Sequence, residues 1–431
     1  MLFANISVLD ENFSVQTGKY VATEGTRIAW IGDAPPANRD YGRVYNGQNK
    51  LLMPGFFNAH SHLPMSLLRG YGENLALDAW LKTRIFPFEA KLTADDIYYG
   101  TMLSIAEMLR FGVVAASDMY YFCEAMARAV LESGVKANLS RGVSCFDERG
   151  YYDLPACREN RHLLEEFDGA GEGRLLIDFA LHAEYTNTER VIREFAAELR
   201  ERGARVQVHV SETKKEHEEC KARHDGRTPV QYLSDLGVFD KPAVAAHCVH
   251  LEDGDFALLR AKNVTVATCP KSNMKLASGV ADAPRILREG VNLALGTDGA
   301  ASNNNLNMFE EIKFFALVQK CFHADPALIA PDEALRAATV AGARAQGRME
   351  SGLLKTGYTA DLIVVDLSAP YLQPPTDLPR HLLYAACGTD VVLTMVDGRV
   401  LYENGDFPTL DLEKITRAAR AAQERILLEL N

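Results

Sequence analysis

The sequence lacks the features of a secreted, membrane-spanning or disulfide-stabilised protein. Its 431 residues contain eight cysteines, and no two of them stand in CxxC spacing. Scattered cysteines in a chain of this length are typical of reduced thiols in a cytosolic protein. The start, MLFANISVLDENFSVQ, has no basic region or long apolar core, and no run approaches the ~18 apolar residues of a membrane span. We therefore expect a cytoplasmic protein without a membrane partner.

Positive charge is also scarce. The chain has 58 acidic and 46 basic residues, a formal net charge of −12. A protein that binds nucleic-acid phosphates regardless of base sequence needs an excess of basic over acidic residues. We therefore expect no nucleic-acid partner. Hydrophobic residues make up 47% of the chain, enough for a substantial core. This length allows one large domain and a smaller companion.

Short alternating apolar and polar segments occupy both ends of the chain. They include 27–33 (RIAWIGD) near the start, and 360–367 (ADLIVVDL) and 391–405 near the end. This pattern predicts strands and turns, and the spacing of apolar residues over 411–430 predicts an amphipathic helix. We expect residues 1–55 and 346–431 to form one small β-sandwich with a C-terminal helix, joined to the remainder at Pro54-Gly55.

The central residues, 56–345, alternate short apolar runs with helical patterns. Eight candidate strands lie at 56–62, 113–120, 136–143, 175–183, 205–212, 243–250, 265–273 and 292–300. Eight β/α units predict an α/β fold in the form of a closed (β/α)8 TIM barrel. An open doubly wound sheet is the alternative, but the Gly-rich phosphate turn usual after its first strand is missing.

Histidines and one aspartate fall at the ends of these candidate strands. His60 and His62 form H-x-H, and alternate residues of a strand point to the same side, so both can face one metal ion. His209 ends the fifth strand and Asp298 the eighth. Each pattern alone is commonly an accident or a good turn. Because the carboxyl ends of barrel strands share one rim, their convergence predicts a metal site.

Three imidazoles and one carboxylate suit Zn²⁺ or Fe²⁺ and leave room for a water, whose pKa the metal lowers towards ~7. Glu212, three residues after His209 in HVSE, can reach that water. His247 ends the sixth strand in AAHCVH, whereas His250 there is expected to bond a loop. The rim therefore predicts a metal-dependent hydrolase in which Glu212, His247 and Asp298 are catalytic.

MPGFFNAHSH, HxxE, AAHCVH and LGTDGAASNN at these intervals resemble the amidohydrolase superfamily. Residues 62–92, together with CPKSNMKLASGVA and TDGAASNN, resemble within it the 5′-methylthioadenosine/S-adenosylhomocysteine deaminases. The resemblance spans essentially the whole chain. It implies hydrolytic deamination of an adenine nucleoside (5′-methylthioadenosine, S-adenosylhomocysteine, adenosine or 5′-deoxyadenosine) to the inosine analogue and ammonia. It also implies one divalent metal per subunit and a homo-oligomer.

The same resemblance implies roles for the residues at the rim. His60, His62, His209 and Asp298 bind the metal. Glu212 moves a proton from the attacking water to purine N1, His247 orients the hydroxide, and Asp298 passes a proton to the departing ammonia. Two carboxylates thereby perform different acid–base tasks.

For the substrate, the resemblance implies that Glu89 accepts the ribose hydroxyls, since a carboxylate offers only acceptors to a diol. Without the resemblance, the sequence would favour a surface charge at the start of a helix for Glu89. His182 then contacts the nucleoside, Trp80 lines the pocket and Ser302 touches the purine.

Arg141 resembles an arginine that holds the carboxylate of a homocysteine tail, within one subunit or across a subunit interface. A second arginine should follow it. Arg149 and Arg158 are the available residues, and neither is a clear match. The preferred 5′-substituent therefore stays open.

Other activities share such a metal site. Triazine chlorohydrolases or aminohydrolases and other nucleobase deaminases are the nearest alternatives, although Glu89 and His182 favour a nucleoside. A non-catalytic scaffold on the same barrel usually loses metal ligands, which this chain keeps. The compact zinc deaminases are disfavoured because their H-x-E…P-C-x-x-C signature is absent.

Overall fold

The central feature of the molecule is a sheet of parallel strands. The computed structural model describes residues 1–37 and 39–430, and its main sheet has the order β14-β13-β12-β11-β10-β8-β7-β6, with β9 paired to β8. The strands are β6 (Phe56–Ser61), β7 (Val113–Tyr120), β8 (Lys136–Val143), β9 (Leu175–Ile177), β10 (Phe179–Ala183), β11 (Val206–Val210), β12 (Ala243–His247), β13 (Val264–Thr268) and β14 (Asn292–Leu295). All eight candidate strands are therefore present, the fourth divided at Asp178 into β9 and β10.

The first and last strands meet at a seam held by side chains. Asn58 Nδ2 donates to Thr297 Oγ1 at 2.7 Å, and the Thr297 amide donates to Asn58 Oδ1 at 2.9 Å. The Asp298 amide donates to the His60 carbonyl at 3.0 Å. These bonds bring the ends of β6 and β14 together and confirm the predicted barrel.

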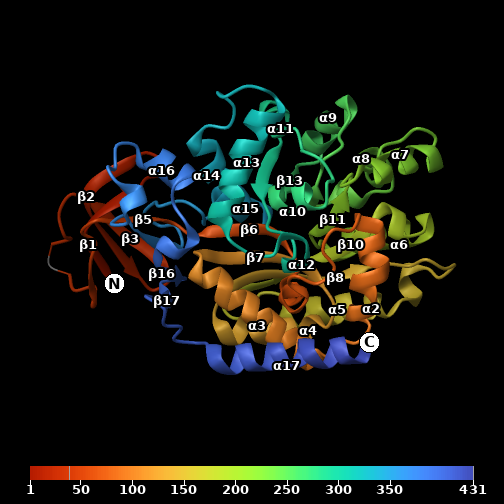
Figure 1. Ribbon diagram of the computed structural model, residues 1–431, viewed down its shortest axis with the longest axis horizontal. Coiled ribbons are helices and arrows are strands. Elements are labelled where there is room, and N and C mark those ends of the chain that lie inside the picture. Colours follow the sequence, from red (N-terminus) through yellow and green to blue (C-terminus); the bar gives the residue numbers. More distant parts are fainter. Residues whose placement is uncertain (38, 431) are drawn as a thin grey trace.

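Helices surround the barrel (Figure 1). The longer ones are α3 (Ala94–Arg110), α4 (Cys123–Ser133), α5 (Pro155–Phe167), α6 (Glu189–Arg202), α7 (Lys214–Arg223), α9 (Asp253–Ala261), α13 (Met308–Phe322) and α14 (Pro331–Ala338). The shorter ones are α1 (Leu77–Trp80), α2 (Phe86–Glu89), α8 (Pro229–Asp235), α10 (Pro270–Lys275), α11 (Ala283–Arg288), α12 (Ala300–Asn303), α15 (Val340–Ala345) and α16 (Leu378–Tyr384). The start of α3 is capped by side chains close in sequence, because Thr93 and Asp96 form a capping box there.

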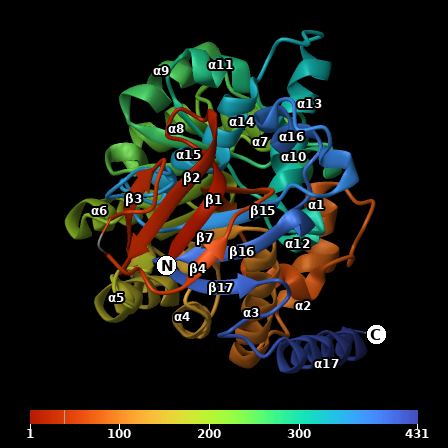
Figure 2. The ribbon, with the colours of Figure 1, turned by 90° about the vertical axis from the view of Figure 1, so that its left-hand side faces the viewer.

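A second sheet combines both chain ends, as expected. Figure 2 shows the N-terminal and C-terminal strands side by side in it. Its strands are β1 (Leu2–Leu9), β2 (Val15–Glu24), β3 (Arg27–Gly32), β4 (Val44–Asn46), β5 (Lys50–Pro54), β15 (Leu362–Asp366), β16 (Val391–Val396) and β17 (Arg399–Glu403). Most pairs are antiparallel, and strands from both ends contribute to a separate hydrophobic core.

The predicted junction lies between β5, which ends at Pro54, and β6, which begins at Phe56. Gly55 fits there because a Cβ atom would lie 2.3 Å from Val114 Cγ1. The domain boundaries themselves stay a prediction. The C-terminal helix, α17 (Leu412–Leu430), packs along α3 on the barrel (Figure 1). Among the described residues, no helix is long and apolar enough to cross a membrane.

Candidate active site

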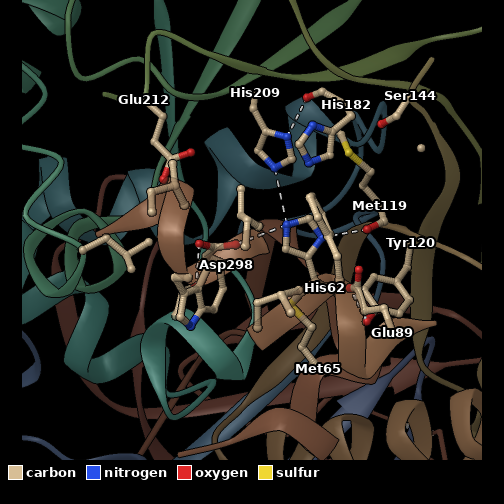
Figure 3. A pocket seen from close by; sticks show the side chains of 18 of the residues that line it. His62, Met65, Glu89, Met119, Tyr120, Ser144, His182, His209, Glu212 and Asp298 are labelled. Carbon is tan, nitrogen blue, oxygen red and sulfur yellow. Dashed lines mark hydrogen bonds and ion pairs between the residues drawn. The ribbon is translucent and has the colours of Figure 1, made fainter. Parts of the chain in front are cut away.

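The four predicted metal ligands meet at the carboxyl end of the barrel. His62 Nε2 lies 3.3 Å and His60 Nε2 3.7 Å from Asp298 Oδ1. His209 Nε2 lies 3.4 Å from His62 Nε2. Figure 3 shows His62 and His209 turned toward one another, with the Asp298 carboxylate beside them. Strands β6, β11 and the loop after β14 therefore bring three imidazoles and one carboxylate to one point.

Bonds on the far side of two imidazoles fix their orientation. His62 Nδ1 donates to the Met119 carbonyl and His209 Nδ1 to the His182 carbonyl, each at 2.6 Å. A carbonyl only accepts, so Nδ1 carries the proton in both rings and Nε2 is turned toward the centre. Such outer bonds are usual for histidines that bind metals.

The Asp298 carboxylate is held in the same way. Its Oδ2 accepts hydrogen bonds from the hydroxyls of Ser272 at 2.6 Å and Ser302 at 2.7 Å. Its Oδ1 faces the histidines. Burial opposes ionisation of this group, but the bond and charge of His62 hold the pKa of Asp298 well below its usual range. In turn, burial would lower the pKa of His62, yet Asp298 raises it to about 9.

His60 shows that these residues fit a bound cation. Its side chain is fully buried, and neither ring nitrogen has a hydrogen-bond partner among the described residues. Burial and the neighbouring His62 keep the pKa of His60 well below its usual value, so the ring is neutral. A buried polar group without a partner is costly, and an ion at Nε2 supplies that partner. The donor set suits a divalent metal.

Two metal-site residues share an unusual backbone. His247 has φ 70° and Asp298 has φ 60°, in the left-handed region that ordinary residues rarely adopt. Ser211, which precedes Glu212, has φ 48°. Each ends or follows a strand at the carboxyl end of the barrel. Such strain gathers at functional sites.

Glu212 is anchored by a residue that the sequence did not single out. Glu216, at the start of α7, accepts the amides of Glu212 at 2.7 Å and Ser211 at 2.9 Å. Glu212 is buried, and burial raises the pKa of its carboxyl group. A carboxyl group with raised pKa in a cleft is suited to accept and release a proton.

His247 faces Glu212 from the end of β12. Its Nε2 lies 3.9 Å from Glu212 Oε2, and its Nδ1 donates to Asn273 Oδ1 at 2.8 Å. Burial opposes protonation, but the carboxylates of Glu212 and Asp298 raise the pKa of His247. His250 instead bonds the Ser278 carbonyl at 2.8 Å, which confirms its expected loop contact.

These groups lie at one end of a cavity with about 740 Å³ of space, its open mouth included. The predicted residues that line it are His62, Trp80, Glu89, His182, His209, Glu212, His247, Asp298 and Ser302. Figure 3 places Glu212 and Glu89 on opposite sides of His62. The Tyr120 hydroxyl donates to Glu89 Oε1 at 2.7 Å, and burial raises the pKa of Glu89 to about 7. Burial and nearby His62 lower the pKa of His182 to about 4, leaving a neutral ring.

The sequence pattern of the amidohydrolase family matches residues 51–401. The chain belongs to this family. A 5-methylthioadenosine/S-adenosylhomocysteine deaminase of Caldanaerobacter subterraneus subsp. tengcongensis is 41% identical over 96% of each chain. A 5′-deoxyadenosine deaminase of Methanosarcina acetivorans is 41% identical over 95% of this chain and 94% of that one. A zinc-bound adenosine deaminase from Xanthomonas campestris superposes with a TM-score of 0.92 at 30% identity, covering 99% and 98% of the chains.

Three predicted substrate residues of this amidohydrolase have contacts of their own. Ser302 donates to Asp298, so its hydroxyl already supports a metal ligand. Arg141 does not line the cavity that holds the metal ligands; it lines an adjoining one and pairs with Glu159 at 2.6 Å. Trp80 is buried in the cavity wall. Their contacts with substrate stay predictions.

Neither candidate for a second arginine lies in these cavities. Arg149 pairs with Asp147 at 2.8 Å, and Arg158 is exposed on α5.

Several lining residues were missed from the sequence. Tyr120 ends the candidate strand 113–120, so its position at the rim was a usable signal. Tyr121 lies in the loop after β7 and Tyr185 in a short 3-10 helix after β10, where strand pattern gives no guidance. Much of the remaining wall is apolar and comes from α1, α2 and the π-helical segment Leu81–Ile85 between them: Leu77, Leu81, Ile85 and Phe86.

Proposed function

We propose that this amidohydrolase removes the 6-amino group of adenine nucleosides by hydrolysis, giving the inosine analogue and ammonia. The observation that carries the proposal is one cavity that holds the metal ligands, Glu212 and His247, with the buried Glu89–Tyr120 pair on the opposite side of His62 from Glu212 (Figure 3). A nucleoside has two parts that match these groups. Its base can be attacked at the metal centre, and the vicinal diol of its ribose can be bound by Glu89. The deaminase names of relatives about 40% identical support the same chemistry.

We further propose zinc as the resident ion, held by His60, His62, His209 and Asp298, since a structural neighbour has it bound. A divalent ion held by these residues would supply hydroxide at neutral pH. Glu212 takes the proton of the attacking water and delivers it to purine N1, which makes C6 more electrophilic. His247 holds the attacking oxygen through Nε2, because its Nδ1 is fixed by Asn273. Asp298 takes the remaining proton of the attacking oxygen and passes it to the departing amine, which leaves as ammonia while C6 becomes a carbonyl.

At the other end, Glu89 accepts hydrogen bonds from the ribose hydroxyls. Its carboxylate is buried, and Tyr120 occupies only Oε1. One oxygen and the spare acceptor sites therefore remain for the substrate. His182 contacts the ribose side of the nucleoside as a neutral ring.

Ammonia release with a panel of substrates tests the activity. We expect the substrate with the highest kcat/KM to be one of the four nucleosides: adenosine, 5′-deoxyadenosine, 5′-methylthioadenosine or S-adenosylhomocysteine. For melamine or a chlorotriazine, kcat/KM should be negligible. The ratios report differential binding of the transition states. Turnover of a triazine with no nucleoside deamination would contradict the proposal and favour the alternative heterocycle hydrolase.

The ribose assignment predicts a pH dependence. Since burial raises the pKa of Glu89 to about 7, the carboxylate protonates as pH falls below that value and loses acceptor capacity. Glu89→Gln should lower kcat/KM for a ribonucleoside about tenfold to hundredfold at pH 8, because bonds to a charged acceptor are lost. The loss should shrink below about pH 6, where the wild-type side chain is also neutral.

A substrate without the diol provides the control for this prediction. With 2′,3′-dideoxyadenosine, wild type and Glu89→Gln should give the same kcat/KM at every pH. An equal loss with both nucleosides would mean that Glu89 acts elsewhere than on the ribose.

We also propose that the protein acts on this small molecule in the cytoplasm, as a homo-oligomer and without a nucleic-acid or membrane partner. Eight cysteines without a disulfide and the acidic balance of the chain support this proposal. Light scattering after size-exclusion chromatography gives the oligomeric state.

A further inference from the structure

Three cavities adjoin in a row at the rim of the barrel. The catalytic cavity shares Phe86, Glu89 and Tyr121 with a middle cavity of about 580 Å³, its open mouth included. The middle cavity shares Tyr121 and Phe122 with an outer cavity of about 930 Å³, again with its open mouth included. Glu89 lies at the first boundary. A nucleoside whose ribose is bound by Glu89 therefore has space for a 5′-substituent beyond it.

The middle cavity is lined almost entirely by apolar side chains. Phe86 and Phe122 are 40% and 48% exposed, and Leu92 and Tyr121 complete the wall. An apolar group placed there covers these rings, and burial of apolar surface contributes about 25 cal/mol per Å². A short uncharged 5′-substituent is accommodated at this point, where Glu89 is the one ionisable carboxylate residue of the cavity lining.

The outer cavity contains Arg141, whose guanidinium is already engaged. Its Nε donates to Glu159 Oε2 at 2.6 Å, its Nη1 donates to the Gly142 carbonyl, and its Cζ lies 4.7 Å from the ring centre of Tyr121. Arginine grips a carboxylate best with two parallel N–H bonds from one edge. The Nε–H of Arg141, one half of such an edge, is occupied by Glu159.

The remaining charged residues of the outer cavity are paired too. His162 Nε2 lies 2.9 Å from Glu124 Oε1. Glu159 and Glu124 thus place two carboxylates in a cavity with one guanidinium and one imidazole, each of which already has an acidic partner. A further carboxylate brought in by a substrate would be repelled by these two glutamates. Repulsion between like charges disfavours binding of such a substrate.

We propose that Glu159 is a specificity-determining residue. By holding Arg141, it makes the enzyme favour adenine nucleosides with a short uncharged 5′-substituent over those whose substituent carries a carboxylate. The inference rests on the proposed deaminase function and concerns the choice among its substrates.

The experiment compares S-adenosylhomocysteine with its carboxamide, which differ only in the carboxylate, and includes 5′-methylthioadenosine as reference. In wild type we expect kcat/KM for the carboxylate to be about tenfold below that for the carboxamide. Glu159→Gln should raise kcat/KM for the carboxylate about tenfold, because one edge of Arg141 is freed. The values for the carboxamide and for 5′-methylthioadenosine should stay unchanged. Glu159 is 47% exposed on its side chain, so the variant folds normally.

Two further variants separate the specific contact from a general effect of charge. Glu124→Gln removes the same charge from the same cavity but frees His162, so its gain for the carboxylate should be much smaller. Adding Arg141→Gln to Glu159→Gln should abolish the gain. Equal gains from Glu159→Gln and Glu124→Gln, or none from either, would overturn the inference while 5′-methylthioadenosine is still deaminated. Absence of all nucleoside deamination would instead defeat the proposed function.

Discussion

Replacing Glu212 by glutamine should lower kcat for nucleoside deamination by about a thousandfold, since a positioned acid–base group contributes between a hundredfold and ten thousandfold. Glutamine has nearly the shape of glutamate but cannot carry a proton from water to N1. The Glu212 amide is held by Glu216, so the turn keeps its place after the change. Burial disfavours the charged form of Glu212, and a neutral amide therefore costs no stability. Steady-state kinetics with the preferred nucleoside give the result.

The expected loss is in turnover and not in binding. Metal content and the affinity for the inosine-type product should match those of wild type. Glu218→Gln is the matched control, because Glu218 is exposed on α7, the helix that follows Glu212, and should leave kcat unchanged. A raised KM with normal kcat in Glu212→Gln would show instead that Glu212 only binds the substrate.

The barrel and its metal ligands could be predicted because strand pattern and polar residues coincide. Apolar runs such as 113–120 and 205–212 are buried strands in the structure, and His209 stands where such a run ends. The period of two along a strand also fixes His60 and His62 on one side. Local sequence therefore indicates where each strand lies and that His60 and His62 share one side of it.

The strand pattern could not predict the exact strand ends or the contacts between separate elements. Four candidate strands were extended by two or more residues: β11 ends at Val210, β12 at His247, β13 at Thr268 and β14 at Leu295. At two of these ends the chain turns through positive φ values, at His247 and at Asp298. Only the folded rim shows that turn. Glu216 acts through backbone amides, and the pairing of Arg141 with Glu159 joins β8 to α5. Thr213 and Glu216 do have the T-x-x-E spacing of a capping box, but that spacing does not show that Glu216 also binds the amide of Glu212, and the Arg141–Glu159 pair leaves no spacing signal.

Removing the metal should abolish activity and reduce stability together. A strong chelator should stop deamination and lower the melting temperature by about 3 °C, which corresponds to losing an ion present at a hundredfold excess over its Kd. The physical reason is His60. Its two buried ring nitrogens have no hydrogen-bond partner among the described residues, and a bound ion gives Nε2 a partner. Adding Zn²⁺ should restore both properties. Calorimetry with and without the chelator, beside an ammonia assay, provides the measurement.

A pair of buried histidines makes this prediction specific to the site. His60→Gln should retain little metal, lose activity by at least about a thousandfold, and show no change of melting temperature with the chelator. His217 is equally buried, but its Nδ1 and Nε2 already bond Ser211 and Glu252, each at 3.1 Å. His217→Gln loses those bonds and stability, yet it should keep its metal and its response to the chelator. If His217→Gln lost metal as completely as His60→Gln, metal loss would reflect damage to the fold, and the assignment of His60 as a ligand would fail.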